Sequence, residues 1–168
     1  MVINMQVGIT GHQERHGIDW KWIEATLQIE ISKLPDVRAA LSSLAKGADQ
    51  VFARVAISLG IPVIAVIPVK DYERFFHGRD RVEYDRLLRN SQVKDLSWKG
   101  DDQLGFFLAG KFIVENTDLL FAVWDEQRSK GLGGTGDIVD YARQLSRKVI
   151  HLNPITQCVQ ELAGERNG

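Results

Sequence analysis

Three segments of the chain combine glycine with residues that hydrogen-bond to anions. The first is Gly8-Ile9-Thr10-Gly11-His12, at the end of a strand-like run. Glycine lets a backbone approach a ligand closely, and the Thr10 hydroxyl with its neighbouring N–H groups can donate to phosphate. A tight turn at the strand exit explains the same residues equally well. His12 is a candidate ligand contact, and we expect no metal site because no second ligand stands at metal-binding spacing from it.

The second segment joins a strand-like run to a helix-like run and supplies five candidates for ligand binding: Ser42, Ser43, Lys46, Gly47 and Asp49. The start of a helix offers free N–H groups and a partial positive charge, which favour an anion. The two serines and the lysine add donors. Asp49 has two open interpretations, as a capping residue in the first helical turn or as an acceptor for ribose hydroxyls.

The third segment, residues 131–137, gives the most specific signal for ligand binding, because four of its first six residues are glycine. Its candidates for a phosphate site are Gly131, Gly133, Gly134, Thr135, Gly136 and Asp137. A glycine-rich turn can gather several backbone N–H groups into a nest that holds phosphate. The alternative is a flexible surface loop, which we favour less because the segment passes directly into a helical pattern.

Two further candidates, Trp124 and Asp125, end a strand-like run. Trp124 can stack on a base or belong to the core, and Asp125 can face a ligand from the strand end. Asp140, about one helical turn beyond the glycine-rich segment, is a candidate catalytic carboxylate only if the protein is an enzyme. Its alternative role is a favourable interaction with the helix dipole.

The elements that must position these residues follow an alternating pattern. Strands are predicted at 5–9, 38–42, 61–67, 92–96, 119–124 and 148–152, and helices at 20–34, 48–59, 71–90, 103–116 and 137–146. The tail beyond Pro154 is expected to form a last helix anchored by Val159 and Leu162. This alternation predicts an α/β fold, a Rossmann-like parallel sheet flanked by helices on both faces. Residues 1–168 form a single domain in this prediction, with the candidates gathered at the carboxyl ends of the strands, where such sheets bind ligands.

Composition narrows the function classes. The chain has 168 residues, 44% hydrophobic and 26% charged, with a net charge of −1, which favours a folded core over disorder. Without an excess of Lys and Arg we expect no nucleic acid as a partner. The single cysteine, Cys158, indicates a reducing compartment. Because no signal peptide or membrane span is apparent, we expect a cytoplasmic protein that does not contact a membrane.

The ordered set of motifs resembles the SLOG superfamily (Smf/DprA and LOG-like domains). The motifs that carry the resemblance are Gly8-Ile9-Thr10-Gly11-His12, Ser43-Leu44-Ala45-Lys46-Gly47-Ala48-Asp49, Val66-Ile67-Pro68, Asp118-Leu119-Leu120, Val123-Trp124-Asp125 and Gly133-Gly134-Thr135. The resemblance implies a Rossmann-like fold that binds nucleotides or nucleotide-derived ligands, and it adds Pro68 to the candidate site. Some members of the superfamily sense nucleotide signals in bacterial conflict systems. Others resemble cytokinin-activating phosphoribohydrolases, which cleave an N-glycosidic bond.

The hydrolase branch carries a motif like Pro-Gly-Gly-x-Gly-Thr-x-x-Glu, and this chain departs from it. Leu132 stands at the proline position, Asp137 at the threonine and Asp140 at the catalytic glutamate. We therefore expect a binding module that senses a nucleotide-derived molecule, related to NAD or ADP-ribose. One alternative is a nucleotide N-glycoside hydrolase that uses Asp140 or Asp125, and another is a structural domain with a vestigial pocket.

The expected partners and cofactors follow from this expected function. No cofactor is expected beyond the nucleotide-type small molecule itself. A sensor with no effector domain of its own needs an effector protein as a partner. Family likeness and the apolar segment Leu104-Gly105-Phe106-Phe107-Leu108 also predict a homo-oligomer, most simply a dimer.

Overall fold

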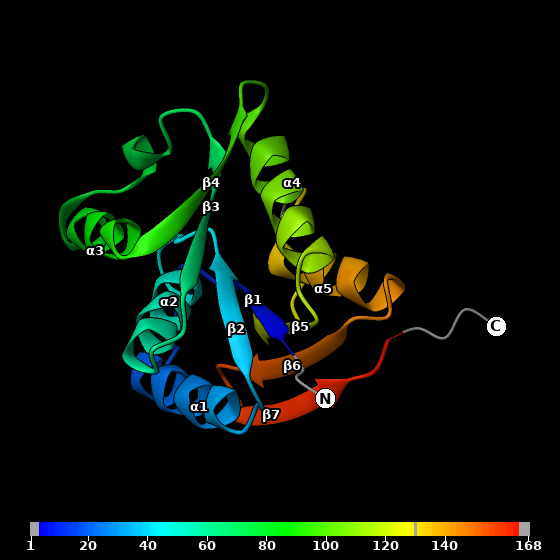
Figure 1. Cartoon of the computed structure of the whole chain (residues 1–168). Helices are drawn as coiled ribbons and strands as arrows, with labels where there is room; N and C mark the ends of the chain where they lie inside the picture. Colours follow the sequence, from blue (N-terminus) through cyan, green and yellow to red (C-terminus); the bar gives the residue numbers. More distant parts are fainter. Residues whose placement is uncertain (1–3, 130, 165–168) are drawn as a thin grey trace.

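The computed structural model describes residues 4–129 and 131–164. Within these residues seven strands form one sheet in the order β4-β3-β2-β1-β5-β6-β7 (Figure 1). The strands are β1 (Met5–Gly11), β2 (Val37–Ser42), β3 (Val63–Val69), β4 (Ser91–Trp98), β5 (Leu119–Val123), β6 (Lys148–Asn153) and β7 (Cys158–Leu162). All neighbouring pairs are parallel except β6 and β7. The predicted Rossmann-like α/β fold is confirmed.

Helices cover both faces of the sheet. They are α1 (Trp20–Ser32), α2 (Ala48–Ser58), the 3-10 helix η1 (Tyr72–Phe75), α3 (Gly78–Arg89), α4 (Asp102–Glu115) and α5 (Thr135–Gln144). In Figure 1, α1, α2 and α3 lie on one side of the sheet and α4 and α5 on the other. Strand residues alternate between the two layers, since Phe121 packs in the core under α1 and α2 and Leu120 packs in the core under α4 and α5. This arrangement leaves the carboxyl ends of the central strands uncovered by the helices that pack on the faces.

The first helix begins where the sequence predicts it. The Asp19 side chain accepts hydrogen bonds from the backbone N–H groups of Lys21 and Trp22, both at 3.1 Å. This satisfies two amides that have no partner within the helix. The buried face of α1 includes Ile23, Leu27 and Ile31, the residues whose helical spacing predicts it.

The prediction of a helix after Pro154 is wrong. Residues 158–162 form β7, which pairs antiparallel with β6 so that Val159 lies opposite Leu152. Asn153 Oδ1 accepts from the backbone N–H groups of Ile155 and Thr156, at 3.0 and 3.1 Å, and so closes a turn that reverses the chain. Hydrogen bonding to β6, a tertiary interaction, outweighs the helical spacing of the two apolar anchors.

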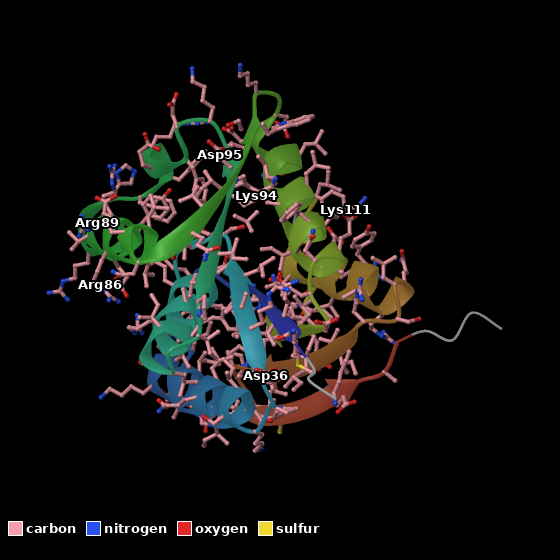
Figure 2. All side chains as sticks on the ribbon, viewed as in Figure 1. Asp36, Arg86, Arg89, Lys94, Asp95 and Lys111 are labelled. Carbon is pink, nitrogen blue, oxygen red and sulfur yellow. The ribbon has the colours of Figure 1, made fainter. Side chains whose placement is uncertain are left out.

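The predicted helix at 71–90 is divided in two. Asp71 has a positive φ of 52°, η1 follows, and Phe76 is extended before α3 begins. The polar face of α3 is solvated, as its mixed charges indicate, and Arg86 and Arg89 point away from the sheet in Figure 2. The division matters for the site because it turns the aromatic residues of η1 toward the carboxyl end of β3.

The structure bears on the expected location and on the expected dimer. No helix in the described part of the chain is long and apolar enough to cross a membrane, and a cytoplasmic location stays a prediction.

The apolar segment at 104–108 packs within the chain, where Phe106 joins one core cluster and Phe107 the other. The dimer therefore stays a prediction without that motivation.

Candidate functional site

A cleft of about 760 Å³ opens at the carboxyl ends of β1, β2, β3 and β5. Its volume is within the range of sites that hold small molecules and cofactors. It is lined by twelve of the residues that the sequence singles out: Thr10, Gly11, His12, Ser43, Lys46, Asp49, Pro68, Trp124, Gly131, Gly133, Gly134 and Thr135. Seven others lie outside its lining: Gly8, Ser42, Gly47, Asp125, Gly136, Asp137 and Asp140.

Gly47 brings the first and second loops together. Its φ is +86°, and a Cβ on it would lie 2.6 Å from the His12 carbonyl oxygen. The same carbonyl accepts the Ala48 N–H at 3.1 Å at the start of α2. The close approach of these two backbones requires glycine, and it places Thr10 and His12 beside the beginning of α2.

Gly8 and Ser42 lie outside the cleft lining and hold neighbouring segments in place. A Cβ on Gly8 would lie 2.5 Å from the Ile113 side chain, so this glycine lets α4 pack closely on β1. The buried Ser42 hydroxyl donates to the Asp49 carbonyl oxygen at 3.1 Å and accepts the Leu44 N–H at 3.0 Å. Both residues shape the loops that line the cleft.

Asp125 anchors the first loop to the end of β5. Its Oδ1 lies 2.9 Å from His12 Nε2, and Arg15 forms an ion pair with its Oδ2. Burial raises the pKa of Asp125, but the Gln127 backbone N–H, His12 and Arg15 together hold that pKa below its ordinary value. Asp125 is therefore ionised at neutral pH, with both oxygens engaged by groups of the chain.

Lys46 is the cation of the second loop. It forms ion pairs with Glu14 of the first loop and with Asp80 of α3, the latter at 3.1 Å. The hydrogen bonds to Glu14 and then Asp80 raise the pKa of Lys46. These three side chains span from the first loop to α3 at an exposed edge, so a bound anion would compete with the two carboxylates for the ammonium group.

One backbone amide of the glycine-rich loop is hydrogen-bonded to a carboxylate of the same chain. Gly133, with a φ of +82°, donates its backbone N–H to Asp137 Oδ2 at 2.9 Å. The Trp124 indole N–H donates to the Gln127 carbonyl oxygen at 3.0 Å, and Gly136 lies against the same indole ring. Asp137 and Gly136 therefore shape the loop from outside the cleft. Asp140 is exposed and outside the cleft lining.

Asp49 is the buried acid of the site. It is 7% exposed, and burial raises the pKa of its carboxyl group to about 7, although backbone hydrogen bonds from Ala45 and Ser43 act in the opposite direction. Burial, followed by the charge of Asp49, raises the pKa of Tyr72 well above its ordinary value. Asp49 therefore lies near Tyr72, on the side of the cleft toward η1.

Sequence reasoning missed an aromatic wall made of Tyr72, Phe75, Phe76 and Phe106, all of which line the cleft. The Phe75 and Phe106 rings meet edge to face with centroids 5.2 Å apart, and Tyr72 and Phe76 do so at 5.0 Å. Three of these aromatic residues stand within five positions of a polar segment, which was the available signal. Phe106 joins them only through the packing of α4.

Several polar residues of the cleft were also missed, among them the donors Arg15, Gln103 and Arg128. With Lys46 they give the cleft several groups that can donate to an anion. Among the residues described, no group of three or more His, Cys, Asp or Glu side chains could hold a metal ion. The arrangement combines donors and glycine loops with an aromatic wall, so it offers contacts both to a phosphate and to a heteroaromatic ring.

No family model matches the chain, and no curated protein matches it. Solved structures do. One is DNA processing protein A (DprA) from Streptococcus pneumoniae, with a TM-score of 0.63 and 19% identity over 89% of this chain and 50% of that one. The chain has a DprA-like fold. A second is DprA from Helicobacter pylori, with a TM-score of 0.63, 16% identity, and 96% and 69% of the two chains covered.

The DprA-like fold agrees with the SLOG resemblance found in the sequence. The chain spans about half the length of the Streptococcus pneumoniae protein, so the fold is what the two have in common. The expectation that nucleic acid is not a partner is corrected by the Helicobacter pylori protein, which has this fold and binds single-stranded DNA. Near-neutral net charge is an average over the surface and does not exclude a local contact with a nucleic acid.

Proposed function

We propose that this chain is a nucleotide-binding module whose ligand occupies the cleft at the carboxyl ends of β1, β2, β3 and β5. The observation that supports it most is the pairing of two chemistries in one cavity. The glycine loops, Lys46 and Arg15 can take the phosphate, and the wall that contains Tyr72 and Phe75 can take the base. The cavity volume of about 760 Å³ suits a ligand of nucleotide size.

In this proposal the chain acts as a ligand sensor. Hydrolysis of an N-glycosidic bond receives less support, because Asp140 is exposed outside the cleft and Asp125 is paired with His12 and Arg15. A general acid or base must reach the proton that it transfers. These two carboxylates are the candidates that the sequence offers for that role.

The test is a thermal-shift and calorimetry panel of nucleoside monophosphates, NAD, ADP-ribose and a short single-stranded oligonucleotide. A ligand at one hundred times its Kd should raise the unfolding midpoint by roughly 5–10 °C. Chromatography of the same mixtures measures release of free base. Binding without base release supports the sensor, base release supports the hydrolase, and the absence of binding by every compound overturns the proposal.

A further inference from the structure

Asp49 is a buried carboxyl group without a cationic partner among the residues that the structure describes. It is 7% exposed and lines the cavity. The ion pairs formed within residues 4–129 and 131–164 do not include it, and its hydrogen bonds come from the backbone of Ala45 and Ser43. A buried ionised carboxyl group is costly unless donors surround it. A ligand that supplies donors would therefore gain binding free energy at this position.

The surroundings of Asp49 are aromatic. Its charge acts on Tyr72, and the Tyr72 ring contacts Phe76 and Phe106, with centroids 5.0 and 6.1 Å apart. Aromatic side chains of this kind can contact the face of a flat ring such as a base. A carboxylate beside them can accept hydrogen bonds from N–H groups at the edge of that base. The cationic Lys46, by contrast, is engaged with Glu14 and Asp80 at the exposed edge. The base end of a ligand is thus the end that lies near Asp49.

Resting on the proposed nucleotide-binding function, we propose that Asp49 determines base specificity by accepting the two adjacent N–H groups of a guanine-type base held by the aromatic wall. An ionised carboxyl group has only acceptors, and the two backbone donors already on Asp49 favour that form. Guanine presents adjacent N1–H and N2–H donors. Adenine presents one donor beside an acceptor, which leaves a carboxylate oxygen facing a ring nitrogen. Asp49 is therefore assigned to the base and not to the ribose.

The experiment measures the affinities of GMP, dGMP, IMP and AMP for the full chain by calorimetry at pH 8. GMP and dGMP should bind about equally, AMP at least about tenfold more weakly, and IMP, which lacks the N2 amino group, between them. Asp49→Asn should abolish the preference for GMP. Asp140→Asn, an exposed carboxylate outside the cleft, is the matched control and should keep it.

Three outcomes overturn the inference, and only one of them also removes the proposed function. Equal binding of AMP and GMP by the natural chain shows that Asp49 does not read the base. Weak binding of dGMP beside tight binding of GMP assigns Asp49 to the ribose. Failure of all four nucleotides and of the wider panel removes nucleotide binding itself. The comparison of nucleotides on the natural chain stands even if Asp49→Asn does not fold, which far-UV circular dichroism reports.

Discussion

The backbone N–H of Gly133 donates to Asp137 Oδ2 at 2.9 Å. One backbone N–H of the glycine-rich loop is therefore already hydrogen-bonded to a carboxylate of the same chain. A negative charge at this position opposes a phosphate bound to the neighbouring amides of the loop. Removal of the Asp137 charge should strengthen the binding of phosphorylated ligands.

Asp137→Asn should accordingly bind a nucleoside monophosphate about fivefold more tightly, the factor that corresponds to about 1 kcal/mol for two charges near 4 Å apart in water. Binding of the unphosphorylated nucleoside should not change, which provides the control. Calorimetry with the two ligands measures both. Equal effects on nucleoside and monophosphate would show that the phosphate lies elsewhere.

Asp49 predicts a stability that falls as pH rises. The folded-state pKa is about 7, and the ordinary value of about 4 applies to the unfolded chain. Between these values the folded state binds the extra proton, so the free energy of unfolding decreases by about 1 kcal/mol per pH unit from about pH 4 to about pH 7. Urea unfolding across this range should show the slope in the difference between the natural chain and Asp49→Asn. A difference that is independent of pH contradicts the raised pKa.

Lys46→Ala should separate binding from stability. Its ion pairs with Glu14 and Asp80 are exposed, so the unfolding midpoint should move by less than roughly 2 °C. Binding of a nucleoside monophosphate should weaken by roughly fivefold at low salt, and the difference should shrink as salt screens the charge. Lys33→Ala, which removes a similar pair with Glu30 on α1, should leave binding unchanged. A loss of affinity that does not depend on salt would argue against a charge contact.

Phe75→Ala tests the aromatic wall. Phe75 is 41% exposed, and the Arg74 guanidinium carbon lies 4.4 Å from the centroid of its ring. Loss of a stacking surface should weaken nucleotide binding by roughly tenfold, with a loss of stability near 1 kcal/mol. Ile29→Ala removes an exposed apolar side chain from α1 and should affect neither. Unchanged affinity in Phe75→Ala places the base away from this ring.

Gly47→Ala tests the contact between the first two loops. Gly47 has a positive φ and faces the His12 carbonyl oxygen, whereas Gly60 has a φ of +72° with no atom near its Cβ position. Gly60→Ala should cost about 1 kcal/mol of unfolding free energy from backbone strain alone. Gly47→Ala should cost more than about 2 kcal/mol because a steric clash is added. Chemical denaturation of both variants measures the difference, and equal losses would mean that the loops separate without cost.

Much of this protein was determined by local sequence pattern. The β-branched run at 61–67, which overlaps β3, the cap at Asp19 and the glycine-rich loop each carry their signal within a few residues. Short-range sterics and hydrogen bonding decide such features, so strand order along the chain and the edge of the sheet that carries the cleft could be predicted. The segments that hold Thr10, Lys46 and Thr135 were predicted in this way, and these three residues line the cleft.

Other features were decided only by the tertiary structure. The tail became β7 because β6 offered an edge to pair with, and Phe106 reached Phe75 because α4 packs across the sheet. The pKa of Asp49 depends on its burial in the folded chain, while Asp140 was left exposed by the orientation of α5. Desolvation and contacts between distant segments are properties of the packed chain, and no local spacing of residues encodes them.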